Sequence, residues 1–173
     1  MPMTTPRDLF IHELSDALSA EQQILKMLPE LQKESRIPEV QQAYRQHEQE
    51  TQHHVQNLQT VFQQLGEKPE ATTCFAVKGI AEEHKALHKE RPSADVLEMA
   101  NLGGADRTEH YEMAMYTGLI QMAKDLGQPQ SAQLLQQNLD QEMAMARRVE
   151  AFSKTLGKQM AGAQMAGAAG GGE

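Results

Sequence analysis

The sequence predicts an all-α protein, a bundle of four long helices with a short fifth helix in the connection between the second and third long helices. The composition is rich in Gln, Glu, Leu, Ala and Met and contains no Trp, which favours helix over strand. Pro and Gly divide the chain into segments of helical length. Within these segments apolar residues recur alternately three and four residues apart, as on one face of a helix.

Local start and stop signals predict the helix boundaries. Thr5 offers a capping hydroxyl and Pro6 a proline at the first helical position. Ile37-Pro38 restarts the chain, because the residue before a proline disfavours helical geometry. Three glycines are the expected helix ends, namely Gly66, Gly127 and Gly157. The predicted helices span residues 6–34, 38–65, 73–90, 93–126 and 129–156.

Length and charge narrow the classes of protein. The 173 residues suffice for one domain, predicted over residues 1–158, and the Gly/Ala-rich tail 159–173 is predicted to be disordered. A net charge of −8 leaves no cationic face for nucleic acid. No apolar run has the length of a membrane span, and the N-terminus does not resemble a signal peptide. The single cysteine, Cys74, fits a reducing compartment, so we expect a cytoplasmic protein without nucleic-acid or membrane partners.

Each predicted inner stripe is apolar at both ends and acidic near its middle. The interrupting carboxylates are Glu21, Glu50, the pair Glu109 and Glu112, and Glu142, in chain order on the four long helices. They lie within about two residues of their helix midpoints, so antiparallel packing brings them to one level. Carboxylates gathered in an apolar interior repel one another, and a multivalent cation removes that cost. Two alternatives are glutamates that reach solvent from the edge of the stripe and protonated carboxyls that hydrogen-bond to each other.

The imidazole that accompanies these carboxylates has three candidates. Glu50-Thr51-Gln52-His53 matches the Glu-x-x-His motif of ferritin-like di-iron proteins. His47 and His54 fit the inner stripe of the second helix better than His53 does. On the fourth long helix Met145 stands where that motif has its second histidine. The predicted metal-site residues are Glu21, His47, Glu50, His53, Glu109, Glu112 and Glu142, with iron or manganese as the ion, in a dinuclear, mononuclear or asymmetric centre.

Longer strings around these residues resemble the YciE/YciF family over about residues 4 to 158. The strings are Leu18-Ser19-Ala20-Glu21-Gln22-Gln23, His47 with Glu50-Thr51, Glu109-His110-Tyr111-Glu112 and Leu139-Asp140-Gln141-Glu142. The resemblance implies a ferritin-like bundle, a homodimer and an association with bacterial stress responses, and it leaves the biochemical activity open.

Two hypotheses for function remain. The first is a metal centre whose reduced ion reacts with oxygen or peroxide. The second is a non-enzymatic stress or interaction protein whose acidic core holds a structural ion or none, which Met145 favours. An iron-storing or DNA-protecting cage fits less well, given the acidic charge and the dimer implied by the resemblance. Met99, Met115 and Met122 lie outside the inner stripe of their helix, so we also expect a homodimer that buries them.

Overall fold

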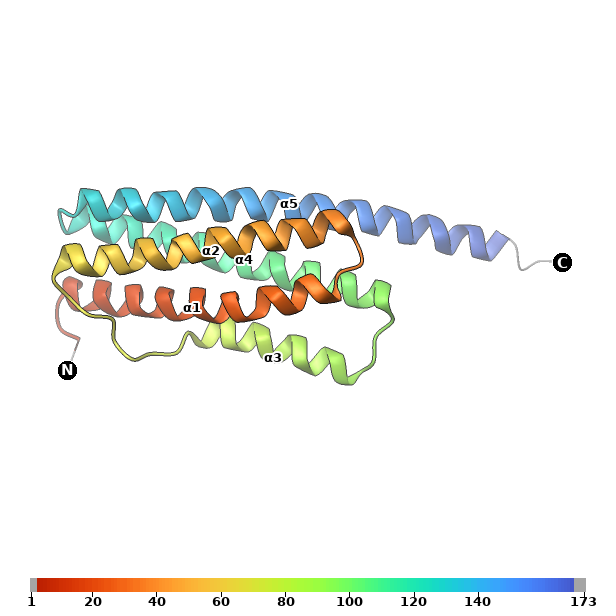
Figure 1. Cartoon of the computed structure of the whole chain (residues 1–173), viewed down its shortest axis with the longest axis horizontal. Helices are drawn as coiled ribbons and strands as arrows, with labels where there is room; N and C mark the ends of the chain where they lie inside the picture. The colour runs from red at the N-terminus through yellow and green to blue at the C-terminus, as the bar shows by residue number, and fades with distance from the viewer. Residues whose placement is uncertain (1–2, 170–173) are drawn as a thin grey trace.

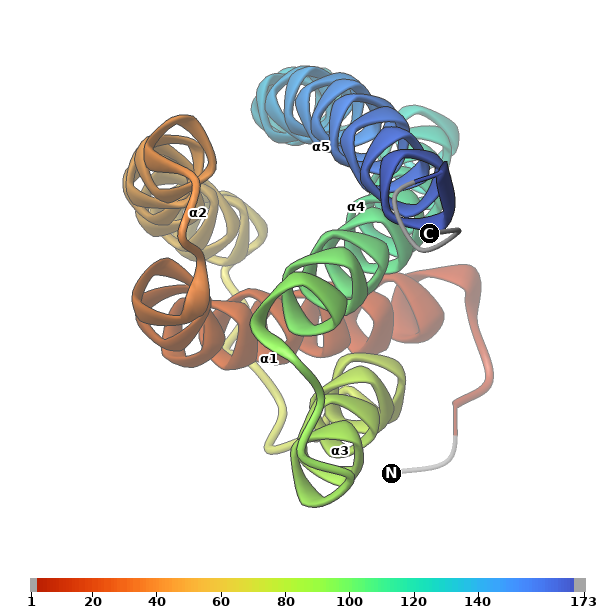
Figure 2. The same ribbon diagram turned by 90° about the vertical axis from the view of Figure 1, so that its right-hand side faces the viewer.

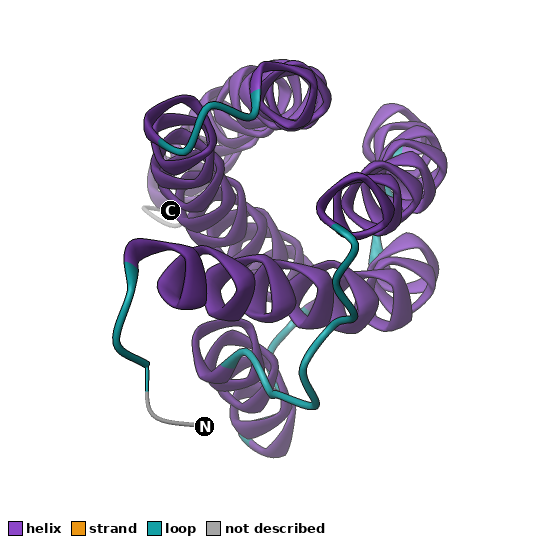
Figure 3. Ribbon diagram, turned by 90° about the vertical axis from the view of Figure 1, so that its left-hand side faces the viewer, coloured by secondary structure: helices purple, strands orange, loops and turns teal. Residues whose placement is uncertain are grey.

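The computed structural model describes residues 3–169, and the side chains of residues 3–162, as an all-helical bundle. The helices are α1 (Pro6–Glu34), α2 (Pro38–Leu65), α3 (Phe75–Lys89), α4 (Ala94–Asp125) and α5 (Pro129–Ala169). No strand occurs in the part of the chain that is described (Figure 3). The predicted fold class, four long helices with a short one in the long connection, is confirmed.

The four long helices form a closed ring of neighbours. α1 packs against α2 and α4, and α5 packs against the same two helices, so α1 and α5 lie on one diagonal of the bundle (Figure 2). Neighbouring long helices run in opposite directions (Figure 1). α3 lies outside this ring against α1 and α4. The centre of the ring is therefore lined by one face from each long helix.

Helix ends follow the predicted signals closely. Thr5 caps α1, its hydroxyl accepting from the backbone N–H of Asp8 at 3.1 Å while the Asp8 carboxylate accepts from the Thr5 N–H at 2.8 Å. Gly66 and Gly127 end α2 and α4 with a φ of 68°, the left-handed conformation that glycine adopts without strain. The expected ends of α1 and α2 are confirmed, and those of α3 and α4 differ by one or two residues.

The end of α5 differs from the prediction. Instead of stopping before Gly157, the helix continues to Ala169, beyond the other helices (Figure 1). Extending a formed helix needs no new nucleus, and the Ala, Met, Gln and Lys residues of this segment favour helix enough to offset the interspersed glycines. Residues 159–169 are described as helix, residues 170–173 lie outside the described chain, and the predicted disorder of the tail 159–173 stays a prediction. The domain boundary at 158 stays a prediction.

The core consists of two apolar clusters with a polar layer between them. One cluster gathers around Phe10, Leu14, Leu58, Leu119 and Leu135. The other gathers around Ile24, Leu28, Tyr44, Leu102 and Val149. The predicted pattern, apolar at both ends and polar in the middle of every inner stripe, is therefore present on all four long helices.

Two surface properties bear on the predicted partners. In residues 3–169, no helix combines the length and apolar character that crossing a membrane requires. Met115 and Met122 pack partly buried against the core of their own chain, whereas Met99 is 45% exposed. The expected homodimer therefore has less apolar surface to cover than the sequence suggested, and it stays a prediction.

Candidate metal centre

The polar layer holds six buried side chains that offer metal-ligating atoms. They come from all four long helices: Glu21 on α1, His47 and His54 on α2, Glu109 and Glu112 on α4, and Glu142 on α5. Each is at most 2% exposed. They form two groups, each with ligand atoms within 4.8 Å of one another, and Glu142 belongs to both groups.

The first group joins α2, α4 and α5 around the imidazole of His47. Its Nε2 lies 3.4 Å from Oε1 of Glu109 and 3.6 Å from Oε2 of Glu142. Glu112, one turn beyond Glu109 on the same face of α4, completes the group. Three carboxylates and one imidazole thus face a common point.

The second group joins α1, α2 and α5 around His54. Nδ1 of His54 lies 2.8 Å from Oε1 of Glu142 and 3.3 Å from Oε1 of Glu21. The two oxygens of Glu142 therefore face different imidazoles, Oε1 towards His54 and Oε2 towards His47. A carboxylate placed in this way can bridge two ions.

Neighbouring side chains orient both imidazoles. The side-chain amide oxygen of Gln141 lies 2.8 Å from Nε2 of His54, so this nitrogen carries a proton. Nδ1 faces Glu21 and Glu142, and it would offer its lone pair to an ion once the ring is neutral. Oε2 of Glu50 lies 3.5 Å from Nδ1 of His47, and the other oxygen of Glu50 accepts from Gln46 at 2.8 Å. Glu50 therefore stands behind His47, on the side away from the other carboxylates.

Hydrogen bonding leaves this layer unsatisfied. Among the described residues, buried side-chain N and O atoms without a hydrogen-bond partner occur on these six residues and otherwise only on Tyr44 and Asn101. Both oxygens of Glu112, both oxygens of Glu142 and both nitrogens of His47 are unpaired. The close approaches of the imidazoles to the carboxylates are not aligned as hydrogen bonds. Since a buried polar atom without a partner costs about 1–3 kcal/mol, these unpaired atoms fit an ion that would bind them.

Charge in the layer is distributed unevenly. Burial, together with the charge of Glu142, raises the pKa of Glu109 and of Glu112 well above the ordinary value of a carboxyl. Burial also opposes ionisation of Glu142, but the imidazoles of His47 and His54 hold its pKa below the ordinary value. Burial disfavours the imidazolium form of His54, yet its contacts with Glu142 and Glu21 raise its pKa to about 10. In the metal-free protein, protons therefore take part of the role that a cation would fill.

Tyr116 supports the α1 side of the layer. Its hydroxyl donates to Glu21 and accepts from the side-chain amide of Asn138 at 3.0 Å. Burial raises the pKa of Glu21 and, to a larger extent, that of Tyr116, so the phenol stays a donor. The Glu21 carboxylate is thereby fixed in orientation.

Five of the seven predicted residues lie in the layer, and two do not. Those brought together are Glu21, His47, Glu109, Glu112 and Glu142. Glu50 contacts the layer only through His47, with 20% of its side chain exposed. His53 is exposed and lies outside both groups. The motif spacing favoured His53, whereas the inner stripe favoured His54. The structure places His54 in the layer, because it follows His47 by seven residues, or about two helical turns, and so lies on the same face of α2.

A cavity of about 380 Å³ extends from the outer surface to this layer. It runs between α1, α3 and α4, and its lining includes His47 and Glu109 at the layer and His84 and Leu87 on α3. The first group of ligands therefore borders this cavity.

The class of protein follows from sequence and fold together. Residues 5–162 match the family described as domain of unknown function DUF892, and the chain belongs to this family. Among curated relatives, it is 33% identical over 145 residues to Protein YciF of Escherichia coli (strain K12), which covers 83% of this chain and 87% of that protein. The resemblance to the YciE/YciF family is thereby confirmed.

Solved structures show the same bundle. The E. coli stress protein YciF superposes with a TM-score of 0.86 at 29% identity, covering 90% of this chain and 99% of that chain. YcfI from Rhodopseudomonas palustris gives a TM-score of 0.82 at 34% identity over 86% of this chain and 94% of that one. A two-domain protein from Anabaena variabilis, with DJ-1/ThiJ/PfpI-like and ferritin-like domains, gives 0.63 at 16% identity over 88% of this chain and 37% of that one. The fold is therefore ferritin-like.

Proposed function

We propose that the polar layer binds a pair of iron or manganese ions, with Glu142 as the shared ligand. The observation that carries this proposal is the set of buried, unpartnered carboxylate and imidazole atoms that face one another from all four long helices. His47, Glu109, Glu112 and Glu142 would hold one ion, and Glu21, His54 and Glu142 the other. Imidazole mixed with carboxylate suits iron and manganese better than calcium or magnesium.

Charge balance supports two ions. The four carboxylates Glu21, Glu109, Glu112 and Glu142 carry four negative charges when ionised, and two divalent cations neutralise them while both imidazoles stay neutral. Without cations the same neutrality requires protons on carboxylates, as the raised pKa values of Glu109 and Glu112 indicate. Binding of the ions should therefore release protons.

The chemistry proposed is a reaction with oxygen or peroxide that enters through the cavity. When bound, iron or manganese supplies the electrons for such a reaction. The chain's own residues orient the ligands: Tyr116 fixes Glu21, Gln141 sets the tautomer of His54, and Glu50 holds His47. Because the relative YciF is described as a stress protein, we propose a role in a bacterial stress response, in the cytoplasm.

The test is metal analysis and titration of protein purified without chelators or a metal-binding tag. Two iron or manganese ions should bind per chain, and Glu142→Ala should weaken both sites at least tenfold because both lose a ligand. His53→Ala is the matched control, since this exposed histidine is outside the layer, and it should bind like the wild type. Retention of both ions by Glu142→Ala would place the metal elsewhere.

A second candidate is a non-enzymatic stress or interaction protein with a structural ion. Met145 favours it, because this side chain is buried in an apolar cluster at the position where a di-iron helix carries its histidine. Oxygen and peroxide consumption by the reduced, metal-loaded protein separates the two candidates. Turnover that disappears in Glu142→Ala supports the redox centre, and stable metal binding without turnover supports the structural role.

A further inference from the structure

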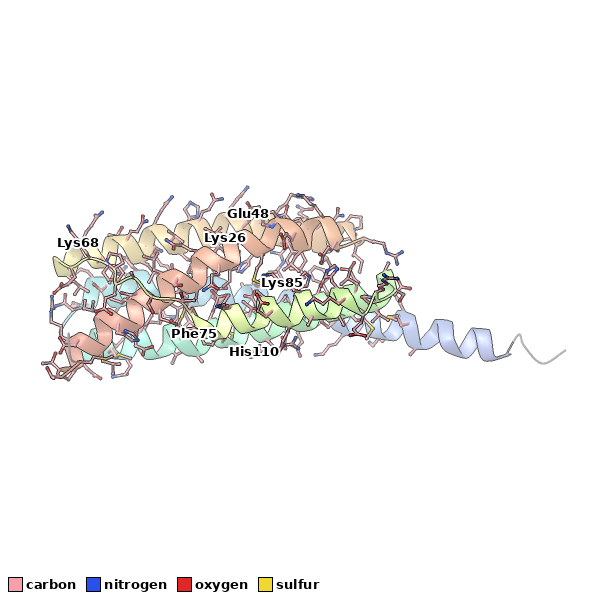
Figure 4. The ribbon with its side chains drawn as sticks, turned by 90° about the horizontal axis from the view of Figure 1, so that it is seen from below. Lys26, Glu48, Lys68, Phe75, Lys85 and His110 are labelled. Atoms are coloured by element: carbon pink, nitrogen blue, oxygen red, sulfur yellow. The ribbon has the colours of Figure 1, made fainter. Side chains whose placement is uncertain are left out.

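A second cluster of metal-ligating side chains lies outside the bundle, where α3 packs on the end of α1. Glu34 is the last residue of α1, and His84 and His88 lie one turn apart on one face of α3. Nε2 of His84 is 2.9 Å from Oε2 of Glu34, and Nε2 of His88 is 2.9 Å from Oε1. The two Nε2 atoms are 3.3 Å apart. Figure 4 views this side of the molecule, with Lys26 on α1 and Lys85 on α3 labelled.

The carboxylate of Glu34 is held in place from a third helix. The side-chain amide of Asn101, a buried residue of α4, donates to Oε2 of Glu34 at 2.8 Å. The side chains of Glu34 and His84 are 20% and 17% exposed, and that of His88 is 40% exposed. The cluster is therefore fixed on the protein side and open to solvent at His88.

The three groups converge on one point. Each Nε2 carries at most one proton, and the two nitrogens approach different oxygens of the same carboxylate at 2.9 Å. The Nε2 atoms lie 3.3 Å apart, and they cannot share a hydrogen bond while both donate to Glu34. A cation bound by both nitrogen lone pairs and the carboxylate would replace these protons.

The spacing also suits a transition-metal ion. Two imidazole nitrogens, each about 2.0–2.1 Å from a tetrahedral zinc ion, lie about 3.3 Å from each other. We propose that Glu34, His84 and His88 form a zinc-type site with three protein ligands, completed by water on the exposed side. Two imidazoles with one carboxylate favour zinc and similar divalent transition ions over magnesium or calcium.

The ion at this site would fasten α3 to α1. Val77 is the one fully buried residue of α3, so apolar packing holds this helix less firmly than the long helices. α3 also supplies Ile80, Glu83, His84 and Leu87 to the wall of the cavity that reaches His47 and Glu109. Zinc bound here would therefore rigidify one wall of the route to the polar layer.

The experiment is zinc titration of the full chain in the Glu142→Ala background, which impairs the bundle-core groups without touching this cluster. We expect one zinc ion per chain, an affinity at least tenfold lower after His84→Ala, and loss of the site in the His84→Ala/His88→Ala double variant. His110→Ala, another exposed histidine, is the matched control and should bind zinc unchanged. Cobalt in place of zinc should give d–d absorption bands that depend on both histidines.

A second measurement uses the wild-type background in case Glu142→Ala folds poorly. Zinc should slow hydrogen exchange of residues 75–89 in the wild type and not in the double variant, because only the wild type ties α3 to α1. The proposal would be overturned if the double variant still bound one zinc ion per chain and zinc still slowed hydrogen exchange of its residues 75–89. The same would follow from a wild-type chain that binds manganese in its core but shows no zinc effect on α3, an outcome that leaves the proposed core function intact.

Discussion

Replacing Glu112 by Leu should stabilise the metal-free protein and reduce its stabilisation by metal. The Glu112 side chain is fully buried, and neither oxygen has a hydrogen-bond partner. Leu has a similar volume and needs no partner, and exchanging unpaired or ionic buried groups for apolar ones commonly stabilises a protein. From the cost of unsatisfied buried polar atoms we expect a gain of about 1–3 kcal/mol. For a chain of this size that is a rise in Tm of roughly 2–4 °C for each kcal/mol.

The assay is urea unfolding with chelator and again with manganese. Saturating metal at a hundredfold excess over Kd stabilises the wild type by about 2.7 kcal/mol for each site, so the stability advantage of Glu112→Leu should shrink or reverse when metal is added. The matched control is Glu98→Leu on the same helix. Glu98 is equally buried, but its oxygens accept from the Ser35 hydroxyl at 2.7 Å and the Arg36 N–H at 2.8 Å, so its loss should destabilise by about 1–3 kcal/mol. Destabilisation by Glu112→Leu in chelator, to the same degree as by Glu98→Leu, would refute the reasoning.

Three further predictions concern the polar layer and the assembly. Glu50→Ala should lower manganese affinity about 10–100-fold but leave the number of bound ions unchanged, because Glu50 only orients His47. Isothermal titration that shows one manganese ion fewer per chain would contradict this. In the metal-free protein Glu109 and Glu112 have a higher pKa than in the unfolded chain. Protonation of these carboxyls therefore stabilises the fold fully at a pH below the pKa of the unfolded chain, and this stabilisation is lost as the pH rises through the pKa of the folded protein. The urea midpoint should therefore fall as the pH rises above the ordinary carboxyl range, and less steeply in Glu112→Leu; equal slopes would argue against protons in the layer. Sedimentation equilibrium at micromolar concentration should show a homodimer, and a species of only 19.3 kDa would exclude it.

The sequence was sufficient to predict the bundle because its signals are local. Thr5-Pro6 and Ile37-Pro38 leave the backbone few alternatives, and the resulting helix starts agree with the structure. The level of the carboxylates was also predictable, since helices of similar length that pack antiparallel align their midpoints. The end of α5 was not, because Gly157 weakens a helix by only about 1 kcal/mol and the following residues favour helix.

The ligand set was predictable only in part. Motif spacing favoured His53, yet one residue shifts a side chain by about 100° around a helix, and only packing decides which of two adjacent histidines faces inward. The cluster of Glu34, His84 and His88 could not be predicted from spacing alone. The charged residues of α3 indicate a solvated face, and they are indeed exposed, but which end of α1 this helix meets depends on the course of the long connection.

The bundle core keeps the donor inventory of a di-iron bundle and distributes it differently among the helices. The usual arrangement takes a glutamate from two helices and Glu-x-x-His from each of the other two, giving four carboxylates and two imidazoles. This chain assembles the same inventory with both imidazoles on α2, one heptad apart, and two of the carboxylates on α4. Met145 therefore does not deprive the layer of an imidazole, because His54 supplies it. Met145 is therefore weaker evidence against a redox centre than the sequence suggested. Turnover, and not the number of ligands, is the property that separates the two candidate functions.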